Sequence, residues 1–307
     1  SIAAVHLSEV VFSGNATGTH GGALHVDDAE LFLEDVVLTH NFAGLGGGAL
    51  RVDSTRSTQP SLRLHRLQAA HNHAEGDGGA VSVVGLAEAE LVDLSLAHNL
   101  AEGAGGGLHV DELGQLTATR LRVVDNHAEY GGGLYIAHVG ASSSEDAPAV
   151  QVKSAVLQQN RARSGGGLCL IASERAAVHH ATIVGNEATE AGAGLCAHGG
   201  ELELRSSVLA WNTGAAALDL LGADTHLSSS HNLWFGNSLD VSRSTGFHAL
   251  VSCTKLVISF LPDPSLATLL SSPSPSPSEQ MMAEILLHTF TTLPSHLPPT
   301  ILHTPPF

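Results

Sequence analysis

The chain has 307 residues, of which 43% are apolar and only 4% aromatic, and its formal net charge is −17. This acidity excludes a partner that is bound by neutralising phosphates, so we expect no nucleic-acid partner. No apolar run reaches the roughly 18–20 residues that a membrane-spanning helix needs, so we expect no transmembrane segment in the chain.

One phrase, an asparagine followed by a glycine pair, recurs from the N-terminus to about residue 240, starting with FSGNATGTHGGALHV at residues 12–26. The anchoring asparagines are spaced 25–34 residues apart and are Asn15, Asn41, Asn72, Asn99, Asn126, Asn160, Asn186 and Asn212, with Asn237 as a degenerate ninth. A glycine follows each of the first six at a nearly constant distance: Gly22, Gly48, Gly79, Gly106, Gly132 and Gly166. A fixed period of this length indicates a repeat architecture.

Apolar residues also recur ten, eight, five and three positions before each asparagine, as in Leu31, Leu33, Val36 and Leu38 of the second repeat. Alternation in runs this short predicts strands, about three in each repeat, and leaves no room for helices. One repeat cannot bury its apolar face alone, whereas repeats stacked about 4.8 Å apart bury a continuous core. The sequence therefore predicts an all-β fold, a right-handed parallel β-helix of about nine coils.

The asparagines and glycines are expected to be structural in this fold. Asparagine tolerates the left-handed backbone that a sharp corner demands. Stacked on its copies, its amide can donate to the next coil and accept from the previous one. The glycine pair allows positive φ and leaves room for the backbone of the neighbouring coil.

The expected domain boundaries follow from the position at which the repeat motif is lost. We expect a β-helix domain over residues 1–245, an irregular end over 246–261 and a disordered, Pro- and Ser-rich tail over 262–307. The tail could also be the product of a shifted reading frame. Two polar insertions, residues 53–60 and 141–148, are expected to form corner loops. Such loops could carry recognition, although an insertion that the fold merely tolerates is favoured. Because the sequence starts within a coil and shows no signal peptide, we expect it to be part of a longer protein.

The strand after the glycines supplies the best candidate for chemistry. Its alternate residues are expected to point outward and form one column: His25, Arg51, Ser82, His109, Tyr135, Cys169, Cys196 and Asp219. Two residues further along each strand lies a second column with Asp27, Asp53 and Asp111. His25 and Asp27 therefore stand beside Arg51 and Asp53 as a small grid, which stops at the third coil.

This grid has two interpretations. Carboxylates on neighbouring coils could bind Ca²⁺ or act as an acid and base pair. The alternative, which we favour, is a solvated face on which Arg51 offsets the two carboxylates, because acidic pairs are only probabilistic markers of a site.

Histidines and cysteines raise two further questions. His40, His71 and His98 precede the repeat asparagine in successive coils and should stack, which could hold Zn²⁺ or Cu²⁺, although a polar corner column without metal is favoured. Cys169 and Cys196 share one repeat position a coil apart, close enough for a disulfide, yet free thiols remain equally compatible with the spacing. Cys253 has no evident partner. We expect no cofactor and no bound metal.

The phrase FSGN followed by GGAL resembles the FxxN and GGA[ILV] repeats of the chlamydial polymorphic outer membrane proteins, and more broadly the chain is similar to pectin-lyase-like β-helices. The resemblance covers roughly residues 1–240. It implies an adhesin-like module of a surface or secreted protein, located outside the cell, with a protein or glycan partner. Because the acidic grid stops at the third coil, we favour a noncatalytic module that serves as a stalk or binding surface. The alternative that it leaves open is a polysaccharide lyase or glycoside hydrolase acting through His25, Asp27, Arg51 and Asp53.

Overall fold

The structure of the chain, a computed structural model, describes residues 3–55, 60–140 and 147–243. The chain divides into two units, Ser1–Val257 and Ile258–Phe307. The expected irregular end and tail, residues 246–307, lie outside the described residues, as do the tips of both insertions at residues 56–59 and 141–146.

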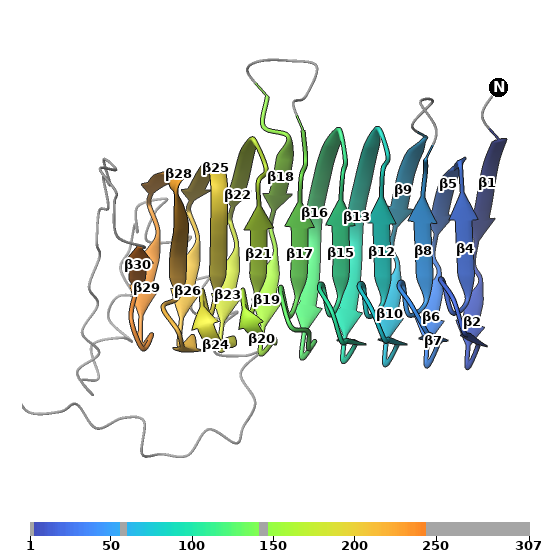
Figure 1. The fold of residues 1–307 in the computed structure, drawn as a ribbon, viewed down its shortest axis with the longest axis horizontal. Helices are drawn as coiled ribbons and strands as arrows, with labels where there is room; N and C mark the ends of the chain where they lie inside the picture. The colour runs from blue at the N-terminus through green and yellow to red at the C-terminus, as the bar shows by residue number, and fades with distance from the viewer. Residues whose placement is uncertain (1–2, 56–59, 141–146, 244–307) are drawn as a thin grey trace, which may run out of the picture. The chain divides into compact units, whose positions relative to one another are not determined.

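The first unit is a parallel β-helix of about nine coils, as the repeat predicts, and its strands lie side by side from β1 to β30 (Figure 1). Most coils run through four straight segments, one more than predicted, because a short strand follows the asparagine. After Asn126, isolated bridges at His127 and Tyr130 take the place of this strand. The described residues contain no helix that could cross a membrane.

The segments of successive coils pair in parallel and form four columns. The column after the glycines contains β4 (Leu24–Asp27), β8 (Leu50–Asp53), β12 (Val81–Val84), β15 (Leu108–Asp111), β17 (Leu134–Ala137), β21 (Leu168–Ile171), the first part of β25 (Leu195–Arg205), the first part of β28 (Leu218–Ser230) and β30 (Val241–Arg243). The next column contains β1 (Ala3–Ser8), β5 (Ala29–Glu34), β9 (Ser61–His65), the first part of β13 (Glu88–Ala97), the first part of β16 (Gln115–Val124), β18 (Val150–Lys153), β22 (Arg175–His179) and the second parts of β25 and β28.

The other two columns lie on either side of the asparagine. The column before it contains β2 (Val11–Ser13), β6 (Val37–Thr39), β10 (Gln68–Ala70), the second parts of β13 and β16, β19 (Val156–Gln158), β23 (Thr182–Val184), β26 (Val208–Ala210) and β29 (Leu233–Phe235). The short column after it contains β3 (Ala16–Thr17), β7 (Phe42–Ala43), β11 (His73–Ala74), β14 (Leu100–Ala101), β20 (Arg161–Ser164), β24 (Glu187–Ala191) and β27 (Thr213–Gly214).

The core fills the inside of the coils with the residues that the alternation predicts. Leu31, Leu33, Val36 and Leu38 are buried in the second coil, and the equivalent residues of later coils are buried in the same way. Burial of this aliphatic column from coil to coil is the main stabilising contribution, at roughly 25 cal/mol per Å² of apolar surface removed from water.

The asparagines form an unbroken ladder along one corner, and the predicted amide pattern is confirmed. Asn72 shows the repeating unit: its Nδ2 donates to Asn99 Oδ1 at 3.0 Å and to the Leu38 carbonyl at 2.9 Å. Its Oδ1 accepts from both the backbone N–H and the Nδ2 of Asn41. All four hydrogen-bonding positions of the buried amide are therefore used, which removes the cost of about 1–3 kcal/mol for a buried unpaired polar group.

The prediction that asparagine itself takes the left-handed backbone is wrong. The residue before it does so, with φ of 55° at His40, 56° at His71 and 55° at His98. The physical reason is that the asparagine side chain must point into the stack to reach its neighbours, so the corner is turned one residue earlier.

The glycine corner has the two predicted features, on adjacent residues. Gly47 has a φ of 67°, and Gly48 packs so tightly that a Cβ there would lie 2.0 Å from the Gly79 carbonyl oxygen of the next coil. Gly22, Gly79, Gly106, Gly132 and Gly166 make the same close approach to backbone. Their role in the fold is to let neighbouring coils meet at this corner.

Candidate functional site

The register of β4 and β8 places all four residues of the predicted grid side by side, and side-chain contacts join three of them. His25 pairs with Arg51, and Asp27 pairs with Asp53, in neighbouring coils. His25 Nε2 lies 2.8 Å from Asp53 Oδ1, and Arg51 Nε lies 3.4 Å from Asp53 Oδ2, where it makes an ion pair but no hydrogen bond. Asp27 is exposed, and no contact with a described residue engages its carboxylate.

The polar contacts continue past the third coil, where the grid was expected to stop. Arg51 Nη1 donates to Ser82 Oγ at 2.8 Å, and Ser82 Oγ lies 3.2 Å from His109 Nδ1. The His109 ring stacks on Tyr135, with the ring centroids 5.4 Å apart. Sequence reasoning missed this continuation because it compared residue types in each coil, whereas a long arginine reaches across coils.

This column of residues, from His25 to Asp219, is called here the post-glycine column. The expectation that it is solvated is wrong for most of the column from the third coil onward, where Ser82 is 0% and Cys169 1% exposed. The glycine corner covers it: a Cβ on Gly78 would lie 2.7 Å from Ser82 Cβ, and one on Gly165 would lie 2.6 Å from Cys169 Cβ. His25 is exposed, and Arg51 and Tyr135 are half-buried.

Burial shifts the titration of several groups in and beside the post-glycine column. Burial lowers the pKa of His109, which favours its neutral imidazole. Burial also lowers the pKa of His20, which stands beside His25, and the nearby Arg51 lowers it further. At the far end of the column, burial raises the pKa of the Asp219 carboxyl.

The Ser82–His109 pair has the atoms of a hydroxyl nucleophile and its base, but not the access. A nucleophile must reach a substrate, and no surface of Ser82 is exposed. Its oxygen also accepts a hydrogen bond from Arg51. The pair therefore serves to satisfy buried polar groups beneath the glycine corner.

The three stacked histidines form a ring column at the asparagine corner. The rings of His40 and His71 are stacked with centroids 5.1 Å apart, and those of His71 and His98 are 4.9 Å apart and nearly parallel. Burial and the neighbouring His98 lower the pKa of His71. Rings that meet face to face direct their nitrogens away from a shared centre. Within the described ranges, no group of three His, Cys, Asp or Glu residues is arranged to hold a metal ion.

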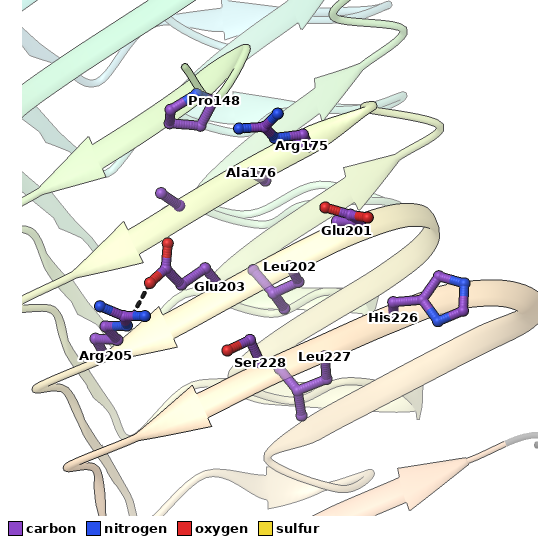
Figure 2. A pocket seen from close by; sticks show the side chains of 11 residues that line it. Pro148, Arg175, Ala176, Glu201, Leu202, Glu203, Arg205, His226, Leu227 and Ser228 are labelled. Carbon is purple, nitrogen blue, oxygen red and sulfur yellow. Dashed lines mark ion pairs between the residues drawn. The ribbon is translucent and has the colours of Figure 1, made fainter. Parts of the chain in front are cut away.

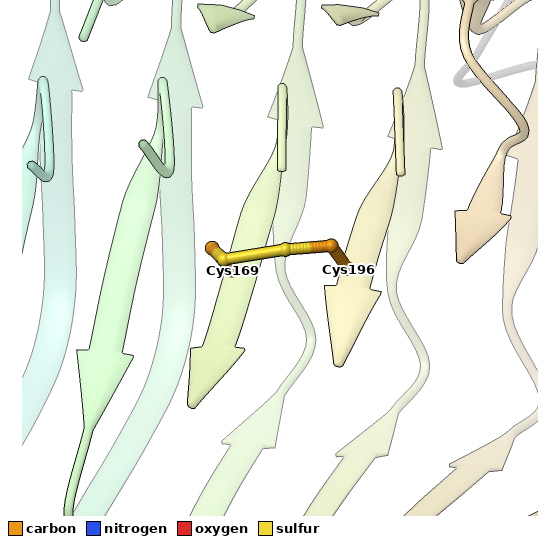
Figure 3. Close-up of a disulfide and its surroundings, with 2 residues drawn as sticks. All are labelled: Cys169 and Cys196. Carbon is orange, nitrogen blue, oxygen red and sulfur yellow. A yellow bond between two sulfur atoms is a disulfide. The ribbon is translucent and has the colours of Figure 1, made fainter. Parts of the chain in front are cut away.

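The two cysteines of the post-glycine column form a disulfide, which resolves the alternative that the spacing left open. Cys169 of β21 and Cys196 of β25 pair directly in the strand register, and their Cα atoms lie 4.8 Å apart (Figure 3). The bond joins two neighbouring coils. Cys253 lies outside the described residues.

A charge ladder at another corner was missed. It occupies the position six residues before the repeat asparagine, where Asp35, Arg66, Asp93 and Arg120 follow one another in successive coils, all with positive φ. Arg66 Nε donates to Asp35 at 2.7 Å, and Arg120 Nε donates to Asp93 at 2.6 Å. The hydrogen bond from Arg66 holds the pKa of Asp35 below its usual range, and Arg120 does the same for Asp93. The alternating signs at one repeat position were the signal.

A pocket of about 480 Å³ lies on the outer face of β22, β25 and β28 (Figure 2). Figure 2 shows Arg175, Glu201 and His226 in succession along one side, and Glu203 with Arg205 toward the other. Arg175, Glu201 and His226 all stand eleven residues before a repeat asparagine. Their shared repeat position could therefore have predicted that they are neighbours on one side of the pocket.

Comparison with protein-family models, with curated proteins and with solved structures finds no match to this chain. The class that the fold defines is a parallel β-solenoid, which is consistent with a pectin-lyase-like fold.

Proposed function

We propose that the chain is a noncatalytic β-helical module of a surface or secreted protein, which serves as an adhesin-like stalk or binding surface for a protein or glycan. The observation that carries the proposal is the state of the predicted grid. Asp53 is held by His25 and Arg51, and Ser82 is sealed beneath the glycine corner. The acid, base and nucleophile candidates other than Asp27 are therefore engaged in holding the coils together, and the exposed Asp27 has no second open carboxylate of the grid with which to form an acid and base pair.

The disulfide supports an extracellular location. Disulfides form and persist in oxidising compartments and are rare in reducing ones. Cys169 and Cys196 are each 1% exposed, so their bond has no surface from which it could act as a redox catalyst. The resemblance of the FxxN and GGA[ILV] phrases to polymorphic outer membrane proteins favours the same location.

The asparagine ladder supports a stalk. It runs from Asn15 to Asn237 without a missing rung, alongside a continuous aliphatic core. A solenoid whose coils are joined by both is expected to resist bending and to hold a binding surface away from its attachment.

The test asks whether the chain cleaves a polysaccharide. The full chain is incubated with polygalacturonate and with a neutral polysaccharide, and new reducing ends and unsaturated products are measured. We expect no product above the buffer control, and the same result for the Asp53→Ala variant. Turnover that Asp53→Ala abolishes would establish the alternative, a polysaccharide lyase or hydrolase.

A further inference from the structure

The hollow of the pocket in Figure 2 arises from differences in side-chain size along one row of residues that runs across the coils. In the strand register, Ala177 of β22, Glu203 of β25 and Ser228 of β28 are neighbours. Two small side chains therefore flank one long one. Arg175 and Arg205 rise on opposite sides of this row and deepen the hollow. Its volume of about 480 Å³ lies in the range of small-ligand sites.

Among the described residues that line the pocket, the arginine and glutamate charges balance one another. Two arginines, Arg175 and Arg205, face two glutamates, Glu201 and Glu203. The Glu203 carboxylate makes an ion pair with Arg205, and its other oxygen lies 3.6 Å from His179 Nε2. Such a lining gives no net attraction for an anion or a cation. It favours an uncharged ligand that presents hydrogen-bond donors and acceptors close together.

Glu201 is the acceptor that is open to a ligand. Its side chain is exposed, and no hydrogen bond or ion pair with the residues of 3–55, 60–140 and 147–243 engages it. Ser228 adds an exposed hydroxyl in the next coil, which both donates and accepts.

The backbone beneath the centre of the pocket is closed to an added strand. β22 pairs with β18 on one side and β25 on the other, and β25 pairs in turn with β28. An extended peptide therefore cannot pair with β22 or β25, which is how peptides often bind to β proteins. Over residues 225–230, β28 is the last described strand of its column. Recognition at Glu201 comes from side chains, and adjacent sugar hydroxyls match its carboxylate and the hydroxyl of Ser228.

We propose that this pocket binds a neutral oligosaccharide, with Glu201 and Ser228 as its hydrogen-bonding groups. This rests on the proposed function as a binding module, and it names the ligand class and the place where the ligand binds.

The experiment is calorimetric titration of the full chain with neutral gluco-, xylo- and manno-oligosaccharides. An oligogalacturonate and a peptide of alternating Lys and Glu serve as charged probes. Two variants disrupt the pocket: Glu201→Gln removes the open carboxylate with little change of shape, and Ser228→Tyr fills the hollow from an exposed position. Glu88→Gln is the matched control, because the register places exposed Glu88 in the same row as Glu201 but several coils away.

We expect saturable binding of at least one neutral oligosaccharide, weakened at least tenfold by Glu201→Gln and by Ser228→Tyr and unchanged by Glu88→Gln. Thermal melts of each variant confirm that the fold is retained. No binding of any neutral oligosaccharide, binding that both variants leave intact, or binding of only the oligogalacturonate or the peptide would each overturn the inference. None of these results requires turnover, whereas turnover of a polysaccharide would overturn the proposed function, so the two failures are distinguishable.

Discussion

The asparagine corner and the post-glycine column are both stacks of one residue per coil, yet they are built in opposite ways. The asparagine corner repeats one residue, and Asn72 bonds to Asn99 as Asn41 bonds to Asn72. The post-glycine column changes residue at nearly every coil. It passes from an ion pair, which Arg51 makes with Asp53 beside the column, through a hydrogen bond and a ring stack to a disulfide.

The difference lies in whether a side chain can bond to copies of itself in both neighbouring coils. An amide both donates and accepts, so a column of asparagines satisfies itself over any number of coils. Residues that lack this property need a specific neighbour, so their column is a series of pairs. Loss of one asparagine should therefore disturb the coils on both sides, whereas loss of one pair in the column should remain local.

The largest expected effect is that of Asn126→Ala, in the middle of the ladder. It removes the side-chain partner of the Asn99 backbone N–H and of the Leu96 carbonyl, and it leaves Asn99 Nδ2 with only its hydrogen bond to the Ala69 carbonyl. Each buried orphan costs about 1–3 kcal/mol, so we expect a loss of roughly 3–5 kcal/mol in the free energy of unfolding, measured by urea titration. Asn15→Ala, in a half-exposed end coil, is the control and should cost much less. Equal losses at the two positions would contradict the ladder.

Removal of the disulfide comes next. The Cys169→Ser/Cys196→Ser double variant should lose about 2–4 kcal/mol of stability, because the unfolded chain is no longer closed into a loop across a sequence separation of 27. The matched measurement is the unfolding of the wild-type chain with and without reductant. A reductant-insensitive wild type would show that the thiols are unpaired in solution.

Substitution of a corner glycine tests whether the glycine corner packs over the post-glycine column. Gly78→Ala places a Cβ 2.7 Å from Ser82 Cβ at a φ of 73°, so we expect a loss of about 1–3 kcal/mol, seen as a lower melting temperature. Gly140→Ala is the control, since its nearest heavy atom would be 3.8 Å from the new Cβ. If the two variants melt alike, the corner does not pack on the column.

The smallest expected effect is a dependence on pH at the end of the column. Burial raises the pKa of Asp219 above its unfolded value, so its contribution to stability is fully present below the unfolded pKa and is lost as the pH rises through the folded pKa. At pH 7 the buried carboxylate is therefore a cost. Asp219→Asn should raise the melting temperature slightly at pH 7 and leave it unchanged near pH 3.5. The exposed Asp224→Asn variant should show no such difference, and a parallel shift in both would refute this reading.

Much of the fold could be predicted because the spacing of the repeated motif determines which residues of neighbouring coils lie side by side. The stretch between Asn41 and Asn72 contains an insertion, yet the two side chains are still hydrogen-bonded. The position of the asparagine, rather than the number of residues in a repeat, therefore sets the register between coils. The core followed from the same alternation, as at Leu62 and Leu64, which are both buried.

The rest depended on how far side chains reach and on what covers them. The Arg51–Ser82–His109 contacts need a side chain that crosses between coils, and residue type alone does not give its direction. The burial of Ser82 needs the glycine corner to fold over it. The pocket exists because Ala177 and Ser228 are small beside Glu203, a difference of volume that a pattern of polar and apolar residues does not record.

The most direct test of the account is hydrogen exchange at the asparagine side chains, followed by NMR on a sample labelled at asparagine nitrogen. Both Nδ2 hydrogens are bonded in each buried rung, as at Asn126, which donates to Asn160 Oδ1 and to the Leu96 carbonyl. We expect both hydrogens of Asn41 to Asn212 to exchange far more slowly than those of an exposed amide. Rapid exchange at the middle rungs would contradict the ladder, and with it the register on which the post-glycine column and the pocket depend.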